Sequence, residues 1–332
     1  MTVIDYMSQE ALRHHLTLSW SHMTVMAPSA DKQLTGLVAA TFTPLTTEGE
    51  INLSVIGPYI DYLTEKQGVN NIFVNGSTGE GLSLTVEERK TLAEDWCVKA
   101  KDKKVQVIVH VGCMSLKDSQ ELAHHAEQIG ADAIAVMAPF FLKPKNADVL
   151  RSYLQEVASV APTRPFYYYH LPAITGINVL VRDLLEGIDE LIPTFRGVKF
   201  SATDLMDFGQ CVSYIQPNWS LLYGVDEQLL AGLAMGADGA IGSTYNYAGC
   251  HINKLIAAFE KGDLVQARTI QFRMQELLRF AIKLGFDMGV NKQLMIVLSG
   301  LSLGPPRLPV MPCPHDIAVS IAQKYRHIFP EC

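Results

Sequence analysis

The run VQVIVHV at residues 105–111 and the run AIAVMAP at residues 133–139, one helix length further on, decide the fold class of this sequence. Both are almost continuously apolar, whereas a strand with one face in water alternates apolar and polar residues. Strands that are apolar on both faces belong to parallel sheets covered by helices on each side. The two runs therefore predict an α/β protein made of alternating strands and helices.

Similar runs rich in Val, Ile, Phe and Tyr continue in both directions, each followed by a polar or Gly-rich turn and a segment with helical periodicity. Strands are predicted at residues 37–43, 71–75, 105–111, 133–138, 165–170, 197–200, 220–224 and 239–242. Eight such units close a (β/α)8 barrel, the TIM barrel. An open doubly wound sheet would carry a G-x-G-x-x-G turn after its first strand, where this sequence reads ATFTPLTTEGE. We therefore expect the barrel.

The chain of 332 residues is longer than a typical domain, although barrels of this kind often reach that length as single units. Residues 34–262 are predicted to form the catalytic barrel. Residues 1–33 are predicted to be a partly flexible N-terminal extension, without the basic start and apolar stretch of a signal peptide. Residues 263–332 are predicted to form a C-terminal helical region, because the run at 270–286 has helical periodicity. The proline-rich stretch GPPRLPVMPCP at 304–314 should interrupt it.

The composition excludes several partners. The 27 basic and 34 acidic residues give a formal net charge of -7, and no Lys/Arg cluster is present, so no nucleic acid is expected to bind. No apolar run approaches the roughly 20 residues of a membrane span, so no membrane partner is expected either. The six cysteines are scattered without a C-x-x-C pair, as free thiols of a reducing compartment are, which predicts a cytoplasmic protein.

Lys199 lies in the apolar run GVKFS at the end of the predicted sixth strand. Active sites of such barrels lie at the C-terminal ends of the strands, so this side chain should point into the barrel mouth. Removal from water lowers the pKa of a lysine and supplies the free amine that attacks a carbonyl. A strand lysine more often reaches solvent or pairs with an acid, so its position alone leaves both interpretations open.

The predicted fifth strand contains three consecutive tyrosines in the run PFYYYHLP. Tyr167 and Tyr169 share one face of the strand and Tyr168 takes the other, because successive side chains alternate. Aromatic runs usually pack in cores, but Tyr169 lies nearest the C-terminal end, where its hydroxyl would transfer protons to and from a substrate. The adjacent His170 is a second candidate for that role.

Hydroxyls and carboxylates follow three other strands. Ser77 and Thr78 lie in the turn NGSTGEGLS and form a suitable cradle for one carboxylate, although such a sequence is also an ordinary turn. Asp226 and Glu227 lie in YGVDEQ, where they either bind a ligand or cap the following helix. The run GSTYN adds the hydroxyls of Ser243, Thr244 and Tyr245. Together these groups suit a polyhydroxylated acid.

Metal and nucleotide sites are not expected. Four histidines, His110, His124, His125 and His170, show neither H-E-x-x-H nor another ligand spacing. The Gly-rich turn at residues 75–83 also lacks the G-x-x-x-x-G-K-[ST] order of a phosphate loop. The sequence therefore predicts chemistry without a metal or cofactor.

Five motifs in this order resemble the N-acetylneuraminate lyase family over essentially the whole chain from residue 34: GSTGE (76–80), YHLPAITG (169–176), GVKFS (197–201), GVDE (224–227) and GSTYN (242–246). The resemblance implies a class I aldolase, in which Lys199 forms a Schiff base with the C2 ketone of open-chain N-acetylneuraminate and Tyr169 transfers protons. Ser77 and Thr78 would hold the carboxylate. The remaining substrate-binding positions would be Ser201, Gly224, Asp226, Glu227 and Ser243. Pyruvate and N-acetylmannosamine would be released by a homotetramer.

Two departures bear on this resemblance. The wider superfamily, which includes dihydrodipicolinate synthase, commonly has a tyrosine after the fourth strand that reaches a neighbouring subunit's site, and this chain has Phe141 there. The synthases also follow the catalytic tyrosine with a carboxylate-binding arginine, whereas this chain has Pro172, Ala173 and Ile174. The missing arginine favours the sialic acid over the synthase substrate.

Three alternatives remain. One is another Schiff-base aldolase or synthase of 2-oxo acids, of the 2-keto-3-deoxygluconate aldolase or the dihydrodipicolinate synthase type. The second is a non-catalytic barrel that binds sugar acids, against which the joint presence of Lys199 and Tyr169 argues. The third, a metal-dependent aldolase, would lose its activity with a chelator.

Overall fold

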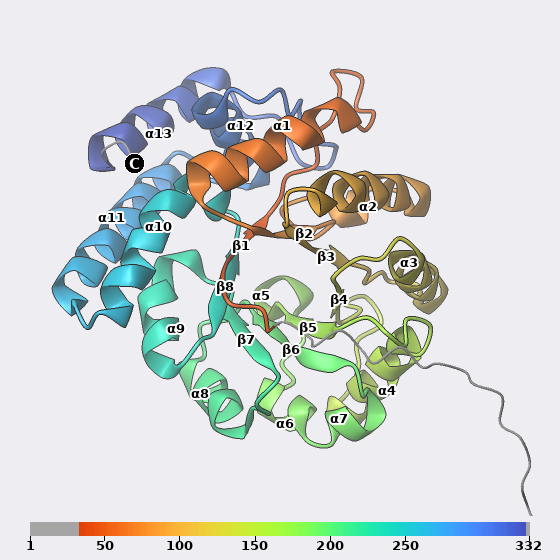
Figure 1. Ribbon diagram of the computed structural model, residues 1–332. Helices are drawn as coiled ribbons and strands as arrows, with labels where there is room; N and C mark the ends of the chain where they lie inside the picture. The colour runs from red at the N-terminus through yellow and green to blue at the C-terminus, as the bar shows by residue number, and fades with distance from the viewer. Residues whose placement is uncertain (1–32, 330–332) are drawn as a thin grey trace, which may run out of the picture. The chain divides into compact units, whose positions relative to one another are not determined.

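The structure is a computed structural model that describes residues 33–329 of the chain, so all but the last residue of the predicted N-terminal extension lies outside it. Eight parallel strands pair in sequence order into a closed barrel, β1-β2-β3-β4-β5-β6-β7-β8, which confirms the predicted fold (Figure 1). The strands are β1 Gly36–Ala40, β2 Asn71–Val74, β3 Gln106–His110, β4 Ala133–Met137, β5 Phe166–His170, β6 Phe195–Phe200, β7 Ser220–Tyr223 and β8 Gly239–Gly242. The observed first strand ends at Ala40 and is therefore shorter than predicted, and the observed sixth strand begins earlier than predicted, at Phe195.

Helices follow the strands and surround the barrel in Figure 1. They are α1 Ile56–Asp61, α2 Val86–Lys101, α3 Leu116–Gln128, α4 Ala147–Ala158, α5 Pro172–Thr175, α6 Val181–Leu185, α7 Ile188–Leu191, α8 Leu205–Tyr214, α9 Leu229–Met235, α10 Tyr245–Glu260, α11 Leu264–Lys283, α12 Met288–Ser299 and α13 His315–Ile328. Short 3-10 turns cover Leu53–Val55, Gly81–Ser83 and Asp226–Gln228, and a π-helical turn, Tyr62–Gln67, continues α1. The helix α2 begins at a capping box formed by Thr85 and Glu88, as its sequence predicts.

The barrel has two separate hydrophobic cores. The larger core fills the space between strands and helices and includes Tyr168. The smaller core fills the barrel interior and includes Phe73, Tyr167 and Tyr169. The fifth strand therefore divides its tyrosines between the two faces as its alternation predicts, and Tyr169 is directed inward.

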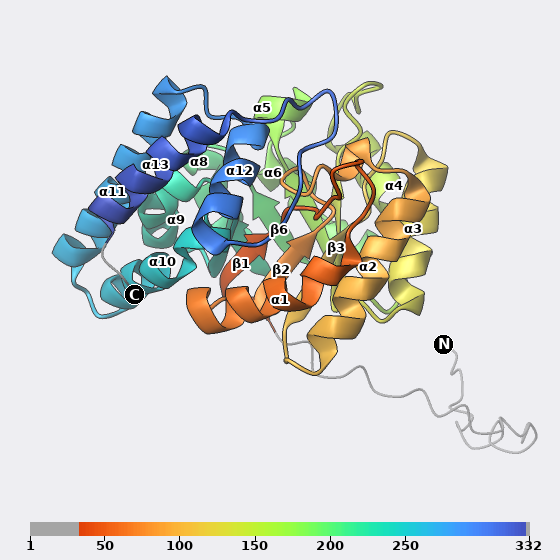
Figure 2. The same ribbon diagram turned by 90° about the horizontal axis from the view of Figure 1, so that it is seen from above.

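The C-terminal helices α12 and α13 were predicted as an appendage, and they are present. In Figure 2, the chain from α12 to α13 passes over the loops that follow β1 and β2. No helix interrupts the proline-rich segment between Ser299 and His315. The proposed division at residue 262 falls in the turn between α10 and α11.

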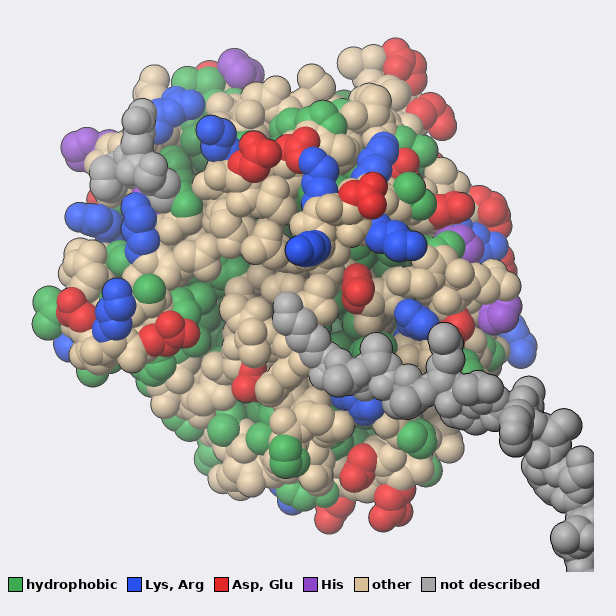
Figure 3. Space-filling view, viewed as in Figure 1, with side chains coloured by type: hydrophobic (Ala, Val, Ile, Leu, Met, Phe, Trp, Pro, Cys, Tyr) green, Lys and Arg blue, Asp and Glu red, His purple; other side chains and the backbone are tan. Residues whose placement is uncertain are grey.

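The surface carries mixed charge. On the face shown in Figure 3, basic and acidic side chains are interspersed and do not separate into patches of one sign. No helix within residues 33–329 is long and apolar enough to cross a membrane. Cys97, Cys113, Cys211 and Cys313 are free thiols, but Cys250 is disulfide-bonded, so the expectation of free thiols throughout is wrong at this position.

Candidate active site at the barrel mouth

A cavity of about 1190 Å³ opens at the C-terminal ends of the strands. The structure places every predicted site residue along it: Ser77, Thr78, Tyr169, Lys199, Ser201, Gly224, Asp226, Glu227 and Ser243. They come from loops after β2, β7 and β8 and from the ends of β5 and β6. The closed barrel brings these segments together because parallel strands all end at the same rim.

Lys199 is the penultimate residue of β6 and is only 4% exposed. Its ammonium lies over two aromatic rings, 4.1 Å from the centre of Phe73 and 4.0 Å from the centre of Tyr169. The structure shows no acid paired with it among residues 33–329. Lys199 is therefore neither exposed to solvent nor paired with an acid of the described part of the chain, the two ordinary roles of a strand lysine. Its ammonium instead lies against the faces of two aromatic rings, which attract a cation.

Tyr169 is the register partner of Lys199 in the neighbouring strand. Its hydroxyl lies 3.3 Å from Oγ of Ser77, the first hydroxyl of the predicted carboxylate cradle. An amine nucleophile, a phenol and a hydroxyl thus meet within one small volume at the base of the cavity. This grouping can form an imine and move protons beside it.

Asp226 lines the same cavity and is buried. Its Oδ2 accepts hydrogen bonds from the backbone N–H of Thr244 at 2.9 Å and from its hydroxyl at 2.6 Å. Burial raises the pKa of Asp226, while the Thr244 hydrogen bonds and the charge of Lys199 lower it. Asp226 and Glu227 both lie in the first turn of the 3-10 helix Asp226–Gln228, where acids are favoured, but the Asp226 carboxylate makes its hydrogen bonds to Thr244 and not to the backbone of that helix. Glu227 lies next to it and is exposed.

Two glycines make room for polar side chains of the site. A Cβ atom at Gly224 would lie 2.1 Å from Oγ of Ser201, and one at Gly242 would lie 2.0 Å from Oδ1 of Asp226. Neither position accepts a side chain without displacing its neighbour. Gly224 therefore belongs to the site by leaving space for the Ser201 hydroxyl.

Sequence reasoning missed Asn291, a buried residue of α12. Its side-chain amide donates a hydrogen bond to Oγ of Ser243 at 2.9 Å, and its Oδ1 accepts one from the hydroxyl of Tyr247 at 3.0 Å. Nothing local in the sequence marks this contact, because Asn291 lies 48 positions beyond Ser243.

His170, the second proton-transfer candidate, packs its ring against Tyr168 and Phe200 of the helix-facing core. Burial lowers its pKa from 6.5 to about 4. When a histidine has a lower pKa in the folded protein than in the unfolded chain, its contribution to the free energy of unfolding is fully present above the unfolded-state pKa. That contribution is lost as the pH falls toward the folded-state pKa. We therefore expect His170→Asn to flatten the loss of stability between about pH 6.5 and 4, by up to about 3 kcal/mol.

Denaturant unfolding of both proteins across this pH range measures the effect. The substitution His124→Asn provides a control at an exposed histidine, and an equal flattening there would show that the effect is not specific to His170. Equal slopes for the wild type and His170→Asn would show that His170 does not titrate differently in the fold.

Only one of the two departures described from the sequence lies at the mouth of the cavity. Phe141 is 83% exposed and does not line the cavity. Pro172, Ala173 and Ile174 do line the cavity, and none of the three is an arginine. Within residues 33–329, no group of three or more His, Cys, Asp or Glu is arranged to hold a metal ion.

Comparisons with known proteins agree on one relationship. The model of the dihydrodipicolinate synthetase family matches residues 33–327. The N-acetylneuraminate lyase of Danio rerio is 60% identical over 294 residues, which cover 88% of this chain and 96% of the relative. The Homo sapiens enzyme of the same name is 56% identical over 298 residues, covering 90% and 93%. The structure of Proteus mirabilis N-acetylneuraminate lyase superposes with a TM-score of 0.84 at 34% identity, over 90% of this chain and 99% of the other.

Proposed function

Because the chain belongs to the dihydrodipicolinate synthetase family and is a lyase, we propose that it cleaves N-acetylneuraminate to pyruvate and N-acetylmannosamine through an imine on Lys199. The observation that carries the proposal is the placement of Lys199. This amine is buried at the base of the cavity, lacks a paired acid within the described residues and faces the hydroxyl-bearing residue Tyr169.

The residues that line the cavity support this proposal for both ends of the substrate. The carboxylate of the substrate binds the hydroxyls of Ser77 and Thr78, which brings the C2 ketone to the amine of Lys199. The hydroxylated tail then meets the remaining predicted binding residues of the cavity, Ser201, Gly224, Asp226, Glu227 and Ser243.

The chemistry proceeds through the enzyme's own side chains. The amine of Lys199 adds to C2, water leaves, and a protonated imine forms. Tyr169, acting alone or with the bound carboxylate, takes the proton of the C4 hydroxyl. The bond between C3 and C4 then breaks, N-acetylmannosamine leaves as an aldehyde, and the electron pair moves into the enamine. Protonation at C3 and hydrolysis release pyruvate and restore the amine.

Reductive trapping tests this proposal. Incubation with pyruvate and borohydride should reduce the imine to a stable secondary amine, and peptide mapping should find the added mass on Lys199. An adduct on a different lysine, or none, would exclude Lys199 as the nucleophile. Steady-state pyruvate release from a panel of 2-oxo sugar acids then separates the sialic acid from 2-keto-3-deoxygluconate and from mere binding.

We further infer a homotetramer, as the family resemblance implies, and a location in the cytoplasm, which the scattered cysteines of the sequence support. The loop after β4 supports the assembly, because it exposes two apolar side chains, Phe141 at 83% and Leu142 at 82%. Light scattering gives the mass of the particle in solution. We also propose the division into an extension (1–33), a barrel (34–262) and a C-terminal helical region (263–332).

A further inference from the structure

A buried ion pair joins the C-terminal helical region to the proposed carboxylate cradle. The ammonium of Lys292 in α12 lies 2.9 Å from Oε1 of Glu80, and the two side chains are 1% and 2% exposed. The same ammonium donates to the carbonyl of Pro305 at 3.0 Å, and the backbone N–H of Arg307 donates to Oε2 of Glu80 at 2.7 Å. The carboxylate thus has partners on both oxygens, all from positions more than 200 residues later.

Glu80 ends the five-residue loop GSTGE that contains Ser77 and Thr78. Its backbone is left-handed, with φ of 54°, which is unfavourable for a residue with a side chain. Its N–H donates to the carbonyl of Ser77 at 3.0 Å, and the N–H of Gly81 donates to that of Gly76 at 3.0 Å. The loop is therefore a compact turn, and a shift of Glu80 moves the residues that carry the cradle hydroxyls.

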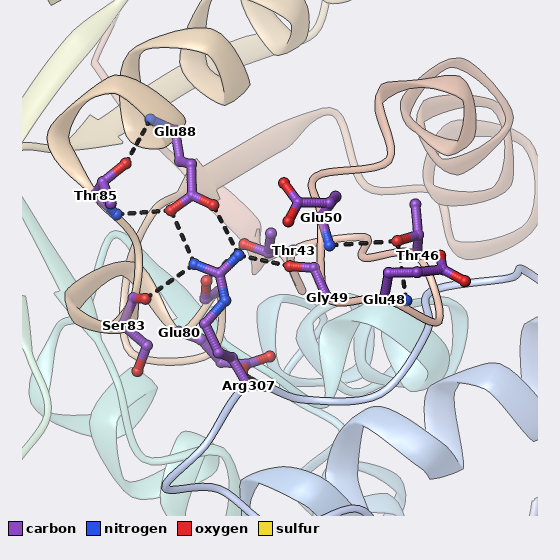
Figure 4. A network of polar contacts seen from close by, with 11 residues as sticks. Thr43, Thr46, Glu48, Gly49, Glu50, Glu80, Ser83, Thr85, Glu88 and Arg307 are labelled. Carbon is purple, nitrogen blue, oxygen red and sulfur yellow. Dashed lines mark hydrogen bonds and ion pairs between the residues drawn. The ribbon is translucent and has the colours of Figure 1, made fainter.

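A second contact fixes the same segment. Figure 4 shows the guanidinium of Arg307 forming two bonds with the carboxylate of Glu88, at 2.8 and 2.7 Å, at the capped start of α2. The guanidinium also donates to the backbone carbonyls of Ser83 and Gly49. The proline-rich segment that presents Arg307 and Pro305 is therefore itself fastened to the loops after β1 and β2.

Buried ion pairs contribute little net stability, because the loss of hydration offsets the attraction between the charges. The main effect of such a pair is therefore to fix the positions of the two residues that form it, rather than to stabilise the fold. The position that this pair fixes is that of the loop beside the nucleophile, since Ser77 also lies 3.3 Å from the hydroxyl of Tyr169.

We propose that Lys292 and Glu80 are positioning residues, which hold the Ser77–Thr78 hydroxyls where the carboxylate of a 2-oxo acid binds. This inference rests on the proposed function. It predicts a defect specific to the carboxylate end of the substrate. Pyruvate carries that end alone, so borohydride trapping of pyruvate on Lys199 isolates it from the tail.

The variants are Glu80→Gln, Lys292→Met and the double variant. The double variant decides, because it removes the pair without leaving one buried charge unpaired, and such exchanges often preserve stability. Its half-saturating pyruvate concentration should rise about tenfold, with a maximal trapping rate within about twofold of the wild type. Lys324→Met, at an ion pair with Glu276 on the surface, is the matched control and should leave both values unchanged.

The outcomes separate the two claims. If the double variant folds and keeps the half-saturating pyruvate concentration of the wild type, the two charges only compensate each other in the interior. That result overturns the positioning role. A fall in maximal rate together with melting temperature would equally point to a general structural role. A wild-type protein that traps no pyruvate would instead overturn the proposed imine, and the positioning role with it.

Discussion

Replacing Lys199 by alanine is expected to abolish cleavage of N-acetylneuraminate, with a loss of about 10⁴-fold or more, and to abolish pyruvate trapping. The amine of Lys199, at the base of the cavity, forms the electron-accepting imine in the proposed mechanism, and without that imine the C3 carbanion has no stabilisation. The substitution leaves Phe73 and Tyr169 in place, because these rings belong to the interior core of the barrel. Initial rates of pyruvate release measure the loss.

A matched control is Lys90→Ala, which removes a lysine from an ion-paired site on α2. It should retain wild-type turnover. Circular dichroism and thermal unfolding of Lys199→Ala establish that the barrel is intact. Substantial residual turnover in a folded Lys199→Ala protein would refute Lys199 as the nucleophile.

Replacing Tyr169 by phenylalanine is expected to reduce the turnover number for cleavage by about 10²- to 10⁴-fold, the usual contribution of a positioned proton-transfer group. The ring that contacts the Lys199 ammonium remains, and so does its packing on Phe73. The variant loses the hydroxyl, and with it the bond to Ser77. The proton of the C4 hydroxyl then has no nearby phenol to receive it.

Tyr167→Phe is the matched control, because Tyr167 lies on the same face of β5, in the same interior core, but does not line the cavity. It should change turnover by less than about threefold. Single-turnover experiments distinguish imine formation from bond cleavage in both variants. If Tyr169→Phe cleaves its substrate at the wild-type rate, the bound carboxylate or another group must take the proton.

The barrel follows from the sequence because each buried parallel strand leaves a local mark. Runs such as residues 105–111 and 133–139 are apolar on both faces, and helical periods separate them. The capping box of Thr85 and Glu88 was readable for the same reason, since all its contacts lie within one turn. Lys199 was readable because the barrel rule assigns function to polar residues at strand ends.

The contacts that hold the site in place left no such mark. Asn291 and Lys292 look like polar residues of an ordinary helix, and only the fold shows that they reach Ser243 and Glu80. The left-handed backbone of Glu80 was equally hidden, because glutamate rarely adopts it. The disulfide at Cys250 could not be predicted either, because the spacing of the cysteines in the sequence does not show which of them are close in the fold.

The adjacency of Asn291 and Lys292 on α12 has a consequence for anyone who wishes to shorten or transplant this barrel. All eight strands of the closed barrel end before residue 262, so a truncation at this residue would keep the whole sheet. Such a cut would leave the Glu80 carboxylate buried without its counterion and Ser243 without its amide partner. A shortened form of the protein must therefore keep α12, although this helix lies outside the barrel sheet.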